Sequence, residues 1–126
     1  MANIIVADDD KLVRVITESV LKGAEHIVRT AKDGDEALQL ADEKPPDIMI
    51  TDIFMPGKNG LEAILEVRRK YPKIGIIAIS GNSATSDGKT SDYLDFARDL
   101  GADCILEKPV ASKQLLEAVS KMLGQP

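Results

Sequence analysis

Residues that could handle a phosphoryl group follow three separate apolar runs of the sequence. Asp8 and Asp9 come after the first run, Asp52 comes after another, and Lys108 comes after the last. Carboxylates held a few ångströms apart repel one another by about 4 kcal/mol per pair at an effective dielectric near 20, so a cluster of them normally needs a cation. A divalent metal would meet that need, and a lysine beside it would attract an anion. Acids, metal and lysine together predict phosphoryl transfer.

These residues can meet only if the fold brings the ends of several strands to one place. Short β-like runs alternate with helical patterns along the chain, which predicts a doubly wound parallel sheet. In such a sheet the carboxyl ends of the strands share one edge, where ligands bind. The expected strands lie near residues 3–7, 26–30, 47–51, 74–79 and 104–107. The expected helices lie near residues 11–22, 34–44, 59–70, 90–100 and 112–123.

The apolar patterns also indicate where each strand lies in the sheet. Residues 4–7, 48–50 and 74–79 are nearly continuous apolar runs. Helices cover both faces of a strand in the middle of a parallel sheet, so these three strands are expected there. The strand near 26–30 alternates more and carries Arg29, which favours an edge position.

Composition bounds the function. The 126 residues suit one domain, and 21 acidic against 16 dispersed basic residues argue against direct nucleic-acid binding. One histidine and one cysteine cannot build a zinc site or an internal disulfide. No apolar run approaches the roughly 20 residues that span a bilayer. The amino terminus lacks the pattern of a signal peptide, so the expected location is the cytoplasm.

Each polar residue at a strand end also has a purely structural interpretation. Asp10 is expected to cap the next helix, which leaves two of the three consecutive aspartates unexplained. Asp52 could be a turn residue, although an asparagine there would avoid the costs of desolvation and repulsion. Lys108 and Ser80 could be no more than polar strand ends. Their joint occurrence at the ends of four strands favours a site.

Short motifs are spread over essentially the whole sequence. They are Asp8-Asp9; Ala31, Gly34 and Glu36-Ala37-Leu38; Asp52 with Met55-Pro56 and Gly60; Ser80; Gly101-Ala102-Asp103; and Lys108-Pro109. With these motifs the chain resembles the receiver domain of bacterial two-component response regulators. The resemblance implies a flavodoxin-like (βα)5 three-layer sandwich with parallel strands in the order 2-1-3-4-5. It also implies that residues 1–126 form one receiver domain, without an output domain.

The resemblance implies a phosphoacceptor. Asp52 would accept a phosphoryl group from a phosphohistidine on a sensor histidine kinase or a histidine phosphotransfer protein. Lys108 would contact one phosphate oxygen, and Ser80 would move to hydrogen-bond another. Such a domain assists its own phosphorylation and dephosphorylation but is not a turnover enzyme on an external substrate.

The resemblance also implies a metal site. Asp9, Asp52 and the backbone carbonyl of Phe54 would coordinate Mg²⁺, and Asp8 would act through a metal-bound water. Ligation by oxygen alone suits the hard, octahedral preference of magnesium, which Mn²⁺ could replace.

Phosphorylation is expected to switch a surface around the fourth helix, fifth strand and fifth helix, which a downstream protein or an output domain outside this chain would read. Two features depart from the family pattern. Ile105 stands three residues before the lysine, where most relatives have an aromatic residue that follows the movement of the hydroxyl. The loop at 81–90 is longer than usual.

Two other functions remain open. A receiver-like adaptor that binds partners without being phosphorylated would fit Ile105 and the long loop. A small haloacid-dehalogenase-type phosphatase would share the Asp-x-Asp of residues 8–10 and the position of Ser80. Against it, Leu12 stands where a threonine or valine is expected, and no late acidic pair follows the lysine.

Overall fold

One parallel sheet organises the chain, as the computed structural model of residues 1–55, 60–80, 95 and 97–124 shows. Within these residues the strand order is β2-β1-β3-β4-β5, which confirms the expected 2-1-3-4-5 order and the flavodoxin-like fold. The strands are β1 (Asn3–Ala7), β2 (Ile27–Ala31), β3 (Ile48–Asp52), β4 (Gly75–Ser80) and β5 (Cys104–Glu107). All neighbouring pairs are parallel, so their carboxyl ends lie along one edge.

The helices begin at or next to the predicted residues. They are α1 (Lys11–Gly23), α2 (Gly34–Glu43), α3 (Gly60–Lys70) and α5 (Ser112–Met122). Of the helix predicted at 90–100, residue 95 and residues 97–100 are described and are helical. The predicted long loop at 81–90 lies outside the described residues.

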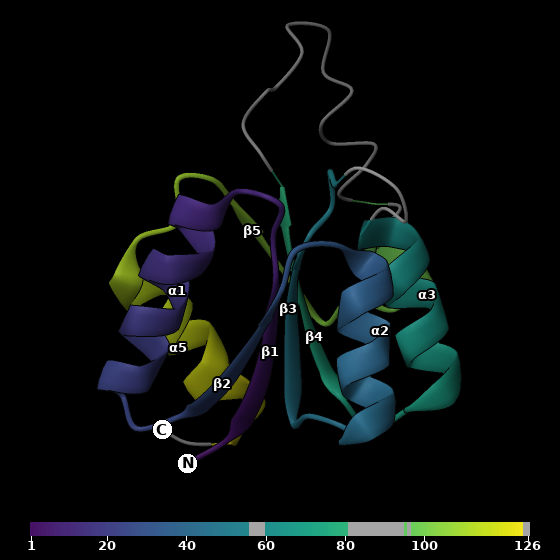
Figure 1. The fold of residues 1–126 in the computed structure, drawn as a ribbon, viewed down its shortest axis with the longest axis horizontal. Helices are drawn as coiled ribbons and strands as arrows, with labels where there is room; N and C mark the ends of the chain where they lie inside the picture. Colours follow the sequence, from purple (N-terminus) through teal and green to yellow (C-terminus); the bar gives the residue numbers. More distant parts are fainter. Residues whose placement is uncertain (56–59, 81–94, 96, 125–126) are drawn as a thin grey trace, which may run out of the picture.

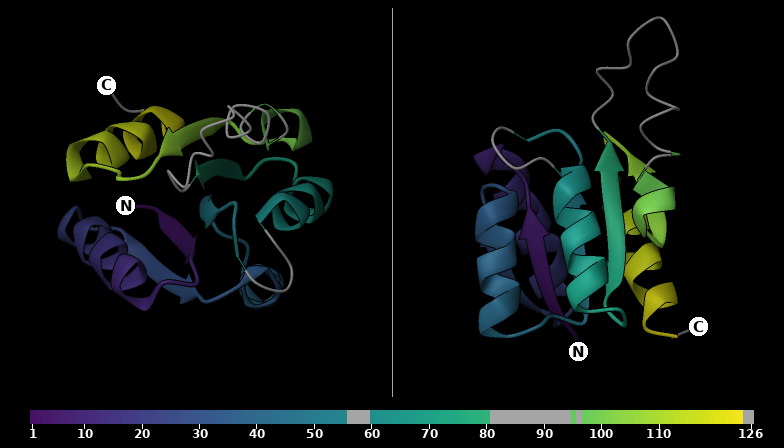
Figure 2. Two further views of the ribbon diagram at one scale, coloured as in Figure 1. Left: turned by 90° about the horizontal axis from the view of Figure 1, so that it is seen from above. Right: turned by 90° about the vertical axis from the view of Figure 1, so that its right-hand side faces the viewer.

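The helices cover both faces of the sheet, so the domain has three layers with the sheet in the middle. Helices α1 and α5 lie on one side, and α2 and α3 lie on the other (Figures 1 and 2). Each side has its own buried core. Along β3 the side chains of Ile48 and Ile50 enter the core under α1 and α5, while Met49 enters the core under α2 and α3. Because both faces are buried, the central strands are apolar without alternation.

The positions of the strands agree with their patterns. The nearly continuous apolar strands β1, β3 and β4 are central, and β2 is at an edge, as predicted. Arg29 of β2 donates hydrogen bonds to the carbonyls of Leu40 and Lys44, 2.8 and 2.7 Å away. Its charge is therefore used to tie the edge strand to the end of α2.

At the edge of the sheet where the strands begin, polar contacts join the loops to α3. Arg68 of α3 donates to the carbonyls of Ile74 and Gly101, and it pairs with Asp103 at 2.6 Å. The Asp103 carboxylate also accepts a hydrogen bond from the amide of Ile76. This network joins the loops that precede β4 and β5. In the described part of the chain, helices long and apolar enough to cross a membrane are absent.

Candidate functional site

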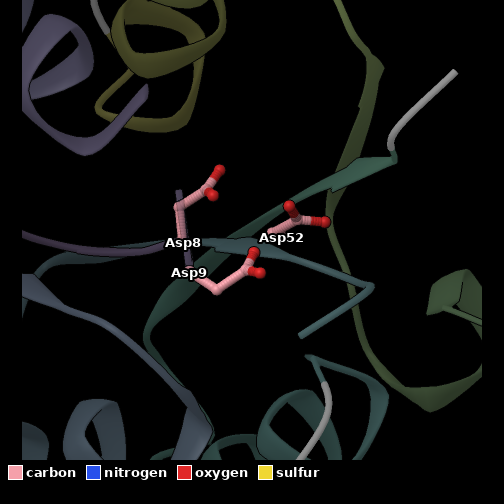
Figure 3. Close-up of side chains that lie close together, drawn as sticks. All are labelled: Asp8, Asp9 and Asp52. Atoms are coloured by element: carbon pink, nitrogen blue, oxygen red, sulfur yellow. The ribbon is translucent and has the colours of Figure 1, made fainter. Parts of the chain in front are cut away.

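Three carboxylates meet at the carboxyl edge of the sheet. Asp52 is the last residue of β3, and Asp8 follows directly after the neighbouring strand β1. One carboxylate oxygen from each of Asp8, Asp9 and Asp52 lies within 4.8 Å of the others. The three side chains gather at one place above the strands (Figure 3). The predicted convergence of these residues is therefore present.

Burial distinguishes these carboxylates from ordinary surface acids. Asp8 is 2% exposed and Asp52 is 4% exposed, whereas Asp9 is exposed. A buried charge is costly unless a partner compensates it, so two of the three groups require a cation. The exposed third group marks the side that solvent and a ligand can reach.

Lys108 supplies one such cation. Its ammonium lies 2.8 Å from the Asp52 carboxylate and 3.0 Å from that of Asp8, so it bridges the two buried acids. The Lys108 amide donates a hydrogen bond to the Ser80 carbonyl at 2.8 Å, which anchors the residue to the end of β4. One lysine cannot neutralise three carboxylates, and the cluster keeps an excess of negative charge.

The pKa values of the central pair are shifted. Burial raises the pKa of the Asp52 carboxyl, and the Asp8 charge adds to this, although hydrogen bonds from Lys108 and the Phe54 amide oppose it. Burial alone would lower the pKa of the Lys108 ammonium, but its bonds to Asp52 and Asp8 outweigh burial and the pKa is raised. Lys108 is therefore held in its charged form.

Short-range contacts orient the Asp52 carboxylate. The amide of Phe54 donates to Oδ1 at 3.0 Å, while Oδ2 faces Lys108. The Thr51 hydroxyl donates to the Asp52 carbonyl at 3.1 Å. Each oxygen of the carboxylate thus has a defined partner, and the group is held at the strand end.

The loop between β1 and α1 is equally ordered. Asp10 caps α1 by accepting from the amides of Leu12 and Val13, which confirms the predicted cap. The Asp10 amide donates to Asp8 Oδ1 at 2.9 Å. The Arg14 guanidinium reaches back from α1 and donates to the Asp8 carbonyl at 2.6 Å. Arg14 was not among the predicted site residues, because an arginine near the start of an amphipathic helix gives no specific signal in the sequence.

The two remaining predicted residues lie beside the cluster. Ser80 ends β4 and is fully buried. Phe54 lies two residues after Asp52, and its side chain is 41% exposed. The Phe54 amide contacts the Asp52 carboxylate. The role of the Phe54 carbonyl as a metal ligand stays a prediction. Ile105 of β5 packs against the core under α2 and α3.

Comparison with known families agrees with this geometry. The family model of the response regulator receiver domain matches residues 4–120. The chain belongs to this family. The receiver is therefore a signalling domain of two-component systems, and the match gives no support to the haloacid-dehalogenase interpretation.

Solved structures similar to this receiver include both isolated domains and a longer protein. The chemotaxis response regulator CheY4 of Vibrio cholerae is 28% identical, with 97% of this chain and 98% of that chain covered and a TM-score of 0.83. A response regulator receiver domain protein from Clostridium thermocellum is 26% identical, with 98% and 95% covered and a TM-score of 0.88. NtrX from Brucella abortus, in complex with ADP, is 27% identical with a TM-score of 0.88. That match covers 98% of this receiver but only 27% of the NtrX chain.

Asp52→Asn is expected to stabilise the metal-free receiver at neutral pH by about 0.5–2 kcal/mol. Because burial raises the pKa of Asp52 above its ordinary 3.8, the folded protein keeps this proton to a higher pH than the unfolded chain does. The free energy of unfolding of the native chain therefore falls as pH rises from the unfolded pKa through the folded one, and the asparagine variant escapes this loss.

Urea unfolding in the presence of a chelator, at neutral pH and at about pH 4, measures the difference in free energy of unfolding between the native chain and Asp52→Asn. The gain should be present at neutral pH and fade in acid. A variant that is less stable than the native chain at neutral pH would mean that the pair with Lys108 outweighs burial.

Proposed function

We propose that this receiver is the phosphoacceptor of a histidine-to-aspartate phosphorelay, with Asp52 as the residue that is phosphorylated. The supporting observation is the buried Asp52 carboxylate, 2.8 Å from the Lys108 ammonium and beside Asp8 and Asp9. The donor is a phosphohistidine on a sensor histidine kinase or a histidine phosphotransfer protein. We place the exchange in the cytoplasm, and we interpret residues 1–126 as one receiver domain.

The donor set fits a divalent metal ion. Asp8, Asp9 and Asp52 offer only hard oxygen ligands, and Lys108 leaves them with uncompensated negative charge. This combination suits Mg²⁺, with Mn²⁺ as a substitute, better than a softer metal. Asp9, Asp52 and the Phe54 carbonyl would hold the ion, and Asp8 would act through a water. When bound, the ion would neutralise charge between the carboxylate and the incoming phosphoryl group.

In the proposed transfer, Asp52 is the nucleophile and Lys108 contacts the transferred group. One Asp52 carboxylate oxygen attacks the phosphorus, the phosphorus–nitrogen bond of the donor breaks, and the imidazole leaves with its electron pair and takes up a proton. The product is an aspartyl phosphate. Lys108, held charged and already in contact with Asp52, would then pair with an oxygen of the transferred group.

The same residues could link phosphorylation to a change of shape. Aspartyl phosphorylation adds negative charge and strong acceptor oxygens next to Ser80, which ends the neighbouring strand β4. We propose that Ser80 moves toward the phosphate and shifts a surface around the fourth helix, β5 and α5. A downstream protein, or an output domain outside this chain, would read that surface. Ile105, packed in the core, takes the position of the usual aromatic reporter.

Incubation with acetyl phosphate and Mg²⁺, followed by intact-mass measurement, tests the proposal. The native chain and the control Asp99→Asn, which changes an exposed acid in helical residues 97–100, should each gain one phosphate that depends on the metal. Asp52→Asn should gain none. If Asp52→Asn also gained a phosphate, a residue other than Asp52 would be the acceptor. No adduct after rapid quenching, with spectra unchanged by beryllofluoride, would favour the phosphorylation-independent adaptor.

A further inference from the structure

Arg14 makes an unusual contact for a residue on the surface of a helix. Its side chain is only partly exposed, and its Nη1 donates to the backbone carbonyl of Asp8 at 2.6 Å. A hydrogen bond from a charged donor is roughly twice as strong as a neutral one. Arg14 therefore joins the second turn of α1 to the residue that begins the acidic cluster.

This contact completes the anchoring of Asp8. The Asp8 amide donates to the carbonyl of Ala31 at 3.0 Å. Its carboxylate accepts from the Asp10 amide and pairs with Lys108. The carbonyl bound by Arg14 is the remaining polar group of the residue. Every hydrogen-bonding group of Asp8 thus has a partner among the described residues.

The carbonyl of Asp8 also controls the next residue. This carbonyl belongs to the planar peptide group that links Asp8 to Asp9. When the direction of the carbonyl is fixed, the positions of the Asp9 amide nitrogen and Cα are fixed with it. Within the described residues, the Asp9 side chain is exposed and has neither a hydrogen bond nor an ion pair. The backbone must therefore place the Asp9 carboxylate near those of Asp8 and Asp52.

We propose that Arg14 is a positioning residue for the divalent cation, which holds the peptide between Asp8 and Asp9 so that the three carboxylates converge. The inference rests on the proposed metal-dependent function and deepens it. Arg14 touches neither the cation nor the phosphoryl group; it acts through the backbone of the residues that would hold the ion.

Two other roles for Arg14 make different predictions. If Arg14 acted mainly through its positive charge, it would repel a cation at the cluster, and its removal would tighten metal binding. If it were only structural, its removal would lower stability and leave the affinity of the folded protein unchanged. Positioning alone predicts weaker metal binding in a protein that is still folded.

The test compares Arg14→Met, Arg14→Lys and the control Arg29→Met. Arg29 also donates to backbone carbonyls, at the far end of α2. Calorimetric titration with Mg²⁺ gives the Kd, and urea unfolding with a chelator gives the stability of the metal-free protein. We expect Arg14→Met to raise the Kd about 10-fold, the lower limit for partners of metal ligands. Arg14→Lys should recover most of the affinity by donating to the same carbonyl, and Arg29→Met should keep the native Kd.

An unchanged or lower Kd for folded Arg14→Met would overturn the proposal while leaving Asp52 phosphorylation intact. If the native chain bound no Mg²⁺, the metal site and the role of Arg14 would fail together. Should Arg14→Met not fold, Arg14→Gln decides, because it lacks the charge but keeps a donor of shorter reach. A raised Kd for that variant supports positioning, and an unchanged or lowered Kd overturns it.

Discussion

Lys108→Met is expected to destabilise the metal-free receiver by about 3 kcal/mol. Removing one partner of a buried ion pair typically costs about 3–5 kcal/mol, and we expect a value at the lower end of this range. The Lys108 side chain is 24% exposed, while those of Asp8 and Asp52 are 3% and 5% exposed. Without the ammonium, two adjacent buried carboxylates face each other with no counter-charge.

Mg²⁺ should restore part of this loss. The proposed cation binds the same carboxylates, and any ligand that binds only the folded state stabilises it. Because the ion and the Lys108 ammonium compensate the same carboxylates, the ion should stabilise Lys108→Met more than it stabilises the native chain. Urea unfolding in chelator and in excess Mg²⁺ measures both the loss of stability and its recovery.

Lys22→Met is the matched control, because Lys22 pairs with Glu18 at 3.0 Å on the helix surface, where the two side chains are 58% and 30% exposed. Exposed pairs of this kind contribute about 0.3–0.5 kcal/mol, so this variant should behave almost as the native chain does. Equal effects of the two methionine variants would show that Lys108 is not the main counter-charge of the cluster.

Gly60→Ala is expected to cost about 3 kcal/mol or more and to reduce phosphorylation of Asp52. A Cβ on Gly60 would lie 2.0 Å from the Asp52 carbonyl oxygen and 2.6 Å from the Ile53 Cα. The Gly60 amide also donates to the Ile53 carbonyl at 3.0 Å. Both clashes are with backbone, which cannot rotate away, so the start of α3 or the end of β3 must move.

Gly23→Ala serves as the control for Gly60→Ala. Gly23 ends α1 and has nothing within 4 Å of a Cβ position, so alanine there should be neutral or stabilising by up to about 1 kcal/mol. Thermal and urea unfolding give the stabilities, and intact mass after acetyl phosphate gives the phosphorylation. Native stability and native phosphate uptake in Gly60→Ala would mean that this close approach does not hold Asp52.

Local patterns determined the elements. The apolar runs of β1, β3 and β4 and the helical stripes between them predicted the alternating fold, because each pattern reflects which faces a segment buries. The Asp10 cap was predictable for the same reason, since it joins groups only two or three residues apart. Asp8, Asp52 and Lys108 could be predicted as a site, because parallel strands all end at one edge. Their roles rested on the resemblance to receivers.

Only the tertiary structure decided how these groups contact one another. Lys108 pairs with both buried acids across the end of β4, a contact that depends on strand order and on the reach of one side chain. The close approach of Gly60 to Asp52 and the bond from Arg14 to Asp8 depend on how helices meet strands. Residue types and spacing predict which strand ends converge. Distances of a few ångströms between particular atoms arise from packing, which no local pattern encodes.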